Sequence, residues 1–192
     1  MSKIKLFKDQ GDFIITLTDD KLMNIIGTKG SGKTTASLKY IDNDRYIVIN
    51  CDRLFELPSF EKEDKELNNV RNILKKKYGE LKENKFKEYY IDIVDYIKHK
   101  KKVGLIEGNV VQDLPIEELK GRVLIKRTGK LKSFYRSVKR DYRNRYWMNE
   151  EKKKHIILYP ITRFFKILKR RSKIFKQAKD IDNIIYKLEN RG

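Results

Sequence analysis

The sequence has little of several residue types, and each shortage removes a class of structure. One cysteine, Cys51, excludes an internal disulfide framework. The two histidines, His99 and His155, lie too far apart to give a metal-ligand spacing. No run of 18 or more apolar residues occurs, so we expect no membrane-spanning helix. The first residues lack the apolar segment of a secretory signal, and a cytoplasmic protein is therefore expected.

Acidic residues are scarce in one part of the chain. Residues 120–192 hold 24 of the 46 Lys and Arg residues but only 6 of the 27 Asp and Glu residues, a net charge of +18, whereas residues 1–119 carry +1. Three interpretations stay open for this basic region. It forms a nucleic-acid-binding surface, an amphipathic helix at an anionic membrane, or a helix that packs on the sheet with a basic outer face.

Short apolar runs alternate with helical patterns, which is typical of a parallel sheet covered on both faces. Buried strands are expected at 22–26, 45–52, 102–108 and 122–127, with a further strand at 154–159. Helical patterns occupy 31–40, 61–101, 113–121, 131–147 and 161–189. An N-terminal β-hairpin is expected from residues 4–7 and 13–17, with Gly11 in its turn. The predicted fold class is α/β, with a three-layer arrangement and a mostly parallel central sheet.

Glycine is concentrated at one point, in the stretch IIGTKGSGKTTASLKY. The sequence G-x-x-x-x-G-K-T within it is the Walker A pattern, or P-loop. A loop that wraps a phosphate turns several backbone N–H groups inward, and glycine adopts the required backbone angles at low cost. The loop also lies between a predicted strand and a predicted helix, whose N-terminus favours an anion. We expect nucleotide phosphates to bind to this loop, which comprises Gly27, Thr28, Lys29, Gly30, Ser31, Gly32, Lys33, Thr34 and Thr35.

Two side chains of the loop have specific expected roles. Lys33 provides a positive charge for the β- and γ-phosphates, and the Thr34 hydroxyl is a ligand for Mg²⁺. The expected cofactors are therefore ATP and Mg²⁺.

The phosphate acceptor is expected beyond the carboxyl ends of the strands, where open parallel sheets bind their ligands. Asp52 follows the second buried strand, and Glu107 ends the third. One of these carboxylates would accept or orient the proton of an attacking hydroxyl, and the other would hold the acceptor or the water ligands of the metal. The sequence does not decide which of the two is the general base.

The quoted segments resemble the P-loop nucleoside and nucleotide kinases, the relatives of adenylate kinase and uridine kinase. IIGTKGSGKTT is similar to their phosphate loop, IVINCD to their second strand with its acceptor-side Asp, and GLIEG to a strand that ends in Glu-Gly. YRSVKRDYRNR, residues 135–145, resembles their Arg-rich lid helix. The resemblance implies a lid that closes over ATP and supplies arginines to the transferring phosphate. Arg136, Arg140 and Arg143 are the candidates, and their spacing places them on one helix face.

The resulting prediction is a single P-loop domain over 1–192, with a core at about 1–128 and 155–192 and a lid at about 129–150. The predicted activity is ATP-dependent phosphate transfer to a nucleoside, a nucleotide or another small hydroxyl or phosphate acceptor. Two alternatives stay open. The first is a kinase of nucleic-acid ends or a nucleic-acid-associated ATPase that uses the basic region. The second is an ATP-binding interaction module without catalysis. The sequence does not determine the oligomeric state.

Overall fold

The computed structural model describes residues 4–9, 13, 21–55, 64–143 and 159–190. The chain divides into two compact units. Unit 1 comprises residues 1–26 and 32–127, and unit 2 comprises residues 27–31 and 128–192. The Walker A pattern crosses this division, because Gly27–Ser31 belongs to unit 2 while Gly32, Lys33 and Thr34 belong to unit 1. The single domain over 1–192 stays a prediction.

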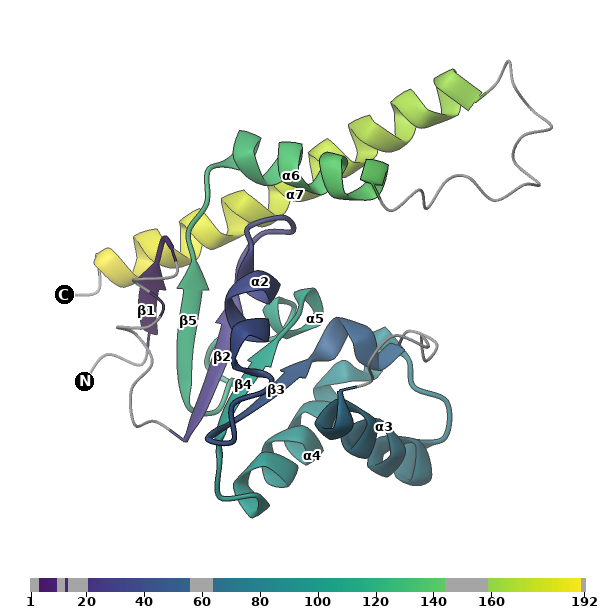
Figure 1. The fold of residues 1–192 in the computed structure, drawn as a ribbon. Coiled ribbons are helices and arrows are strands. Elements are labelled where there is room, and N and C mark those ends of the chain that lie inside the picture. The colour runs from purple at the N-terminus through teal and green to yellow at the C-terminus, as the bar shows by residue number, and fades with distance from the viewer. Residues whose placement is uncertain (1–3, 10–12, 14–20, 56–63, 144–158, 191–192) are drawn as a thin grey trace. The chain divides into compact units, whose positions relative to one another are not determined.

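The centre of unit 1 is a five-stranded, all-parallel sheet. Its strands in chain order are β1 (Ile4–Phe7), β2 (Leu22–Ile26), β3 (Tyr46–Asn50), β4 (Val103–Glu107) and β5 (Arg122–Lys126). In space they follow the order β1-β5-β2-β4-β3 (Figure 1). The four buried strands expected from the sequence, β2, β3, β4 and β5, are confirmed, and the α/β fold class with them. All four are nearly continuous apolar runs, as strands buried on both faces require.

The prediction of an N-terminal hairpin is wrong for the residues that the structure describes. The first strand, β1, pairs in parallel with β5, with Phe7 opposite Lys126. Phe13, which was expected to begin the second hairpin strand, is helical, and its amide donates to the Asp9 carbonyl at 3.1 Å. Residues 14–17 lie outside the described residues. The physical reason is burial, because the Phe13 and Phe7 side chains are both buried and their ring centroids lie 4.9 Å apart.

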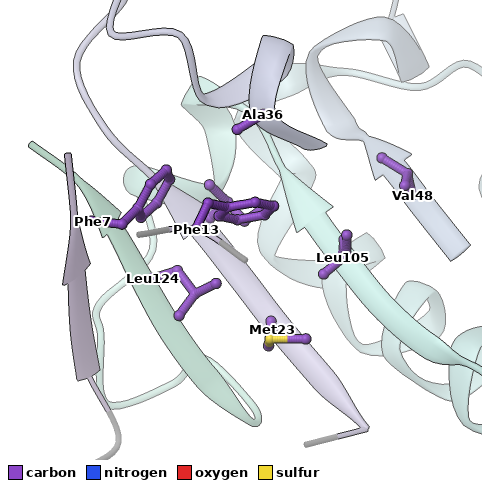
Figure 2. Packing of buried hydrophobic residues seen from close by; sticks show 8 residues of the cluster. Phe7, Phe13, Met23, Ala36, Val48, Leu105 and Leu124 are labelled. Atoms are coloured by element: carbon purple, nitrogen blue, oxygen red, sulfur yellow. The ribbon is translucent and has the colours of Figure 1, made fainter. Parts of the chain in front are cut away.

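One face of the sheet packs an apolar core against α2 (Lys33–Ser37). Figure 2 shows Phe7, Phe13 and Leu124 close together, with Ala36 of α2 above the sheet. The complete cluster is Phe7, Phe13, Met23, Ile25, Ala36, Val48, Leu105 and Leu124. Because these residues come from all five strands and from α2, the core fixes the position of the helix that carries the last residues of the Walker A pattern.

Helices from the polar segment at 61–101 cover the opposite face. They are α3 (Lys65–Tyr78) and α4 (Phe86–His99), the latter preceded by the 3₁₀ helix η3 (Glu83–Lys85). Asn24, between Met23 and Ile25 on β2, points to this face and accepts a hydrogen bond from the Tyr90 hydroxyl of α4 at 2.9 Å. The sheet of unit 1 therefore has a helix on each side, which is compatible with the predicted three-layer arrangement.

Two short helices differ from the sequence-based expectations. The helix expected at 31–40 is shorter, with α2 followed by the 3₁₀ helix η1 (Leu38–Tyr40). It begins at Lys33 because Gly32 has φ 93°, which is not helical. The helix expected at 113–121 is wrong, since Pro115 begins only a turn, in which Glu118 N donates to the Pro115 carbonyl at 3.0 Å. A helix, α5 (Asn109–Gln112), instead follows β4 directly.

The described residues of unit 2 include two helices, α6 (Lys130–Arg143) and α7 (Tyr159–Glu189). The first confirms the basic helix expected from residue 131, although 144–147 lie outside the described residues. The second confirms a helix over 161–189 as one continuous element. The strand expected at 154–159 is wrong for Tyr159, which begins α7, and its other residues lie outside the described part. No helix in the described ranges combines the length and apolar character needed to cross a membrane.

Candidate functional site

Three strand ends meet at one edge of the sheet in unit 1. Glu107, the last residue of β4, is opposite Ile25 of β2 on one side and opposite Asn50 of β3 on the other. The connection from β2 leads to β3 at one edge of the sheet, whereas the connection from β4 leads back past β2 to β5. Neighbouring strands whose connections leave in opposite directions form a crevice at their carboxyl ends, which is where such sheets bind ligands.

Lys33 begins α2 and carries the first functional group at this edge. It is 5% exposed, and its Nζ donates to the Asn109 Oδ1 at 3.0 Å. Asn109 in turn is held by Asp52, which lies in the 3₁₀ helix η2 (Cys51–Phe55) after β3. The Asn109 backbone N and Nδ2 donate to Asp52 Oδ1 and Oδ2, each at 2.7 Å. The sequence-predicted Lys33 and Asp52 are thus brought together through a residue between them.

Gly108 makes the close approach of Asp52 to α5 sterically feasible. Its φ is +150°, and a Cβ built there would lie 3.0 Å from Asp52 Oδ1 and 3.1 Å from the Asp52 backbone N. Only glycine adopts this backbone conformation at low cost and also leaves the space free. The glycine that follows Glu107 therefore has a structural role, because it lets the Asp52 carboxylate of η2 reach the backbone amides of Asn109 and Val110 in α5.

Glu107 lies at the same edge and is fully buried. Its Oε2 accepts a hydrogen bond from the Thr34 hydroxyl at 3.1 Å, while its Oε1 has no hydrogen-bond partner among the described residues. Burial raises the pKa of Glu107 from 4.5 to about 7, against the opposing effects of the Lys33 charge and the Thr34 hydrogen bond. Asp52 adds a smaller upward contribution through charge repulsion.

The Glu107 and Thr34 oxygens fit a hard cation such as Mg²⁺. A buried carboxylate oxygen without a donor, beside a hydroxyl, is the kind of oxygen pair that Mg²⁺ uses when substrate phosphates complete its coordination. The described ranges hold no cluster of three or more His, Cys, Asp or Glu side chains suited to a metal ion. The residues present therefore suit a cation that arrives with a phosphate ligand better than an all-protein metal site.

The first half of the Walker A pattern, Gly27–Ser31, contacts other residues of unit 2. The Thr28 and Ser133 hydroxyls lie 3.1 Å apart, and Thr128 Oγ1 donates to the Ser31 carbonyl at 3.2 Å. At Gly30, with φ +83°, an added Cβ would come within 2.3 Å of the Ser133 carbonyl oxygen. This glycine lets the loop backbone approach α6 closely. The phosphate contacts predicted for Gly27–Ser31, like those predicted for Thr35 in α2, stay predictions.

The predicted lid arginines all lie in α6. Arg136 is exposed, and its Nη1 donates to the Ser31 carbonyl at 3.5 Å, so it contacts the glycine-rich segment within unit 2. The side chains of Arg140 and Arg143 lie outside the described residues. Their role as lid arginines stays a prediction.

Sequence reasoning missed Asn109, which joins Lys33 to Asp52. The available signal was its position directly after the Glu-Gly that ends a predicted strand, at the edge where the other polar groups were expected. Cys51, beside Asp52, is fully buried, and desolvation raises the pKa of its thiol well above the ordinary value. A buried thiol of this kind packs as a small apolar side chain.

Comparisons with protein-family models and with curated proteins found no match to this chain.

Proposed function

We propose that this protein transfers the γ-phosphate of ATP to a small hydroxyl or phosphate acceptor, at the carboxyl edge of β2, β3 and β4. The observation that carries the proposal is the arrangement of Lys33, Thr34 and Glu107. A buried ammonium group, a hydroxyl and a buried carboxylate interact at the carboxyl ends of β2 and β4, where the strand connections leave in opposite directions. Their place at the end of a Walker A pattern supports a nucleoside triphosphate as the ligand.

The proposed roles follow from the charge of each group. Phosphoryl transfer depends mainly on positioning the reactants and on stabilising negative charge, and the protein takes little part in covalent chemistry. Lys33 would neutralise charge on the β- and γ-phosphates, and its low exposure makes that interaction stronger than in water. Thr34 and Glu107 would hold Mg²⁺, which supplies further neutralisation of the phosphate oxygens when bound.

A second candidate function is phosphate transfer to a nucleic-acid end, and the surface of unit 2 favours it. The apolar residues Ile174, Ala178 and Ile181 of α7 are buried, and much of the rest of the described surface of α6 and α7 is basic. The exposed side chains of α6 and α7 include Lys130, Lys132, Arg136, Lys139, Lys169, Arg171, Lys173, Lys176, Lys179 and Lys187. These exposed basic side chains fit a polyanion such as a nucleic-acid backbone, and the same two helices also expose the apolar or aromatic side chains of Leu131, Tyr135, Phe165, Leu168 and Tyr186.

One experiment tests both candidates. Protein, γ-labelled ATP and Mg²⁺ are incubated with nucleosides, nucleotides, sugars and oligonucleotides bearing a 5′-hydroxyl. We expect label to move from ATP to one class of small acceptor. Transfer to the oligonucleotides alone, lost steeply as salt is raised, would instead support the second candidate. Protection of the protein from heat by ATP without transfer to any acceptor would contradict both and favour a non-catalytic binding module.

A further inference from the structure

The contacts around Asn109 give Asp52 a role different from the one its sequence position suggests. Both Asp52 oxygens accept hydrogen bonds from Asn109, at 2.7 Å each, and Val110 N donates to the Oδ1 at 3.3 Å. The Asn109 side chain then extends to Lys33, whose Nζ donates to the Asn109 Oδ1 at 3.0 Å. Three polar residues from three segments thus form one chain of hydrogen bonds that ends at the Lys33 ammonium.

The orientation of the Asn109 amide follows from donors and acceptors alone. An ionised carboxylate can only accept hydrogen bonds, and an ammonium can only donate them. The Asn109 Nδ2 must therefore point to Asp52 and its Oδ1 to Lys33, because the reversed amide would place two acceptors together on one side and two donors on the other. Asp52 consequently decides which atom Asn109 presents to Lys33.

We infer that Asp52 and Asn109 are positioning residues for Lys33, and that Asp52 acts on the phosphates through this chain rather than as the general base. The inference rests on the proposed function, because it assigns the Lys33 ammonium to the triphosphate. Hydrogen bonds to charged groups contribute about 1.5–3 kcal/mol, so loss of the chain corresponds to roughly a tenfold to hundredfold effect on a step that needs Lys33 in place.

The substitution Asp52→Asn disrupts the chain in a defined way. An amide at position 52 has one acceptor and one donor, whereas the Asn109 backbone N and Nδ2 are both donors. The conflict is relieved when the Asn109 amide reverses, which turns its Nδ2 toward the Lys33 ammonium. The single substitution Asn109→Asp is equally unfavourable, because it sets a second carboxylate against Asp52.

The double variant D52N/N109D restores every pairing with the roles exchanged. The new amide accepts from the residue-109 backbone N through its oxygen and donates through its nitrogen to the new carboxylate. The other oxygen of that carboxylate then faces the Lys33 ammonium. A chain that positions Lys33 is therefore rescued by the exchange. A general base at position 52 is not rescued, because its carboxylate has moved to another residue.

The test compares wild type, both single variants and the double variant in single-turnover phosphate transfer at saturating ATP and Mg²⁺. We expect about a tenfold or larger loss in each single variant, and recovery in the double variant to within about threefold of wild type. Asp64→Ala is the matched control. Asp64 accepts two backbone amides at the start of α3, at 3.0 and 3.2 Å, so its loss should lower the melting temperature but leave turnover unchanged.

Two outcomes would overturn the inference. The first is a double variant no more active than Asp52→Asn while both retain a cooperative unfolding transition. The second is read by nuclear magnetic resonance and does not depend on catalysis. The Asn109 side-chain amide signal, assigned by its absence in Asn109→Asp, should shift in Asp52→Asn, and an unchanged signal would contradict the chain. A wild type that transfers no phosphate would remove the proposed function but leave this second measurement intact.

Discussion

Lys33→Ala is expected to reduce ATP-dependent phosphate transfer by about a thousandfold while the protein still folds. The Lys33 ammonium is buried beside Glu107 and Asn109, where the dielectric response is weak and a positive charge interacts strongly with phosphate. Alanine removes that charge and favours the helical conformation of α2, so the fold has no reason to be lost. The measurement is the initial rate of label transfer from ATP, with far-ultraviolet circular dichroism to verify the fold.

A matched control is Lys39→Ala in η1. This lysine is exposed and lies six residues further along the same segment, so its removal should change the rate by less than about twofold. A Lys33→Ala protein that keeps the wild-type rate would contradict the assignment of Lys33 to the phosphates. Equal losses in both variants would indicate a nonspecific effect of charge.

Glu107→Gln is expected to stabilise the metal-free protein at pH 8 but not at pH 4. The folded-state pKa of Glu107 is about 7 against an ordinary 4.5, with burial as the main cause. Below pH 4.5 the carboxyl is protonated in both states and contributes nothing. Between pH 4.5 and 7 the unfolded chain loses this proton while the folded protein keeps it, so the free energy of unfolding falls by about 3 kcal/mol as pH rises. Glutamine does not titrate and avoids that loss.

The measurement is urea unfolding of wild type and Glu107→Gln at pH 4, 6 and 8, with a chelator present. The stability difference between the two should grow through this range in favour of the variant. Glu117→Gln is the control, because this side chain is exposed and its substitution should give the same small difference at every pH. A Glu107→Gln protein that is less stable than wild type at pH 8 would show that the buried carboxylate is better compensated than its contacts indicate.

The sequence predicted the parts of the fold that depend on local patterns. β2, β4 and β5 are nearly continuous apolar runs and are buried on both faces, and a helix begins at Lys33, directly after Gly32. The edge that brings Glu107 close to Thr34 was also predictable, because parallel strands carry their following residues to one side of the sheet.

The remaining features depend on tertiary contacts that a local pattern does not contain. The contact between the buried Phe13 and Phe7 rings places Phe13 in a helical conformation, whereas the local sequence also suits the start of a hairpin strand. The position of Asn109 depends on Asp52, which is 57 residues away in the chain. The contact between Gly30 and Ser133 is likewise fixed by packing at long range, which the Walker A pattern does not specify.

Isothermal titration of the wild-type protein with ATP in the presence of Mg²⁺ tests the central claim most directly. We expect saturable binding near one ATP per chain, weakened at least about tenfold in Lys33→Ala, since a charge-assisted contact with phosphate contributes more than about 1.4 kcal/mol. Binding of equal strength in wild type and Lys33→Ala, or no binding in wild type, would contradict the claim that the edge formed by β2, β3 and β4 receives the phosphates of ATP.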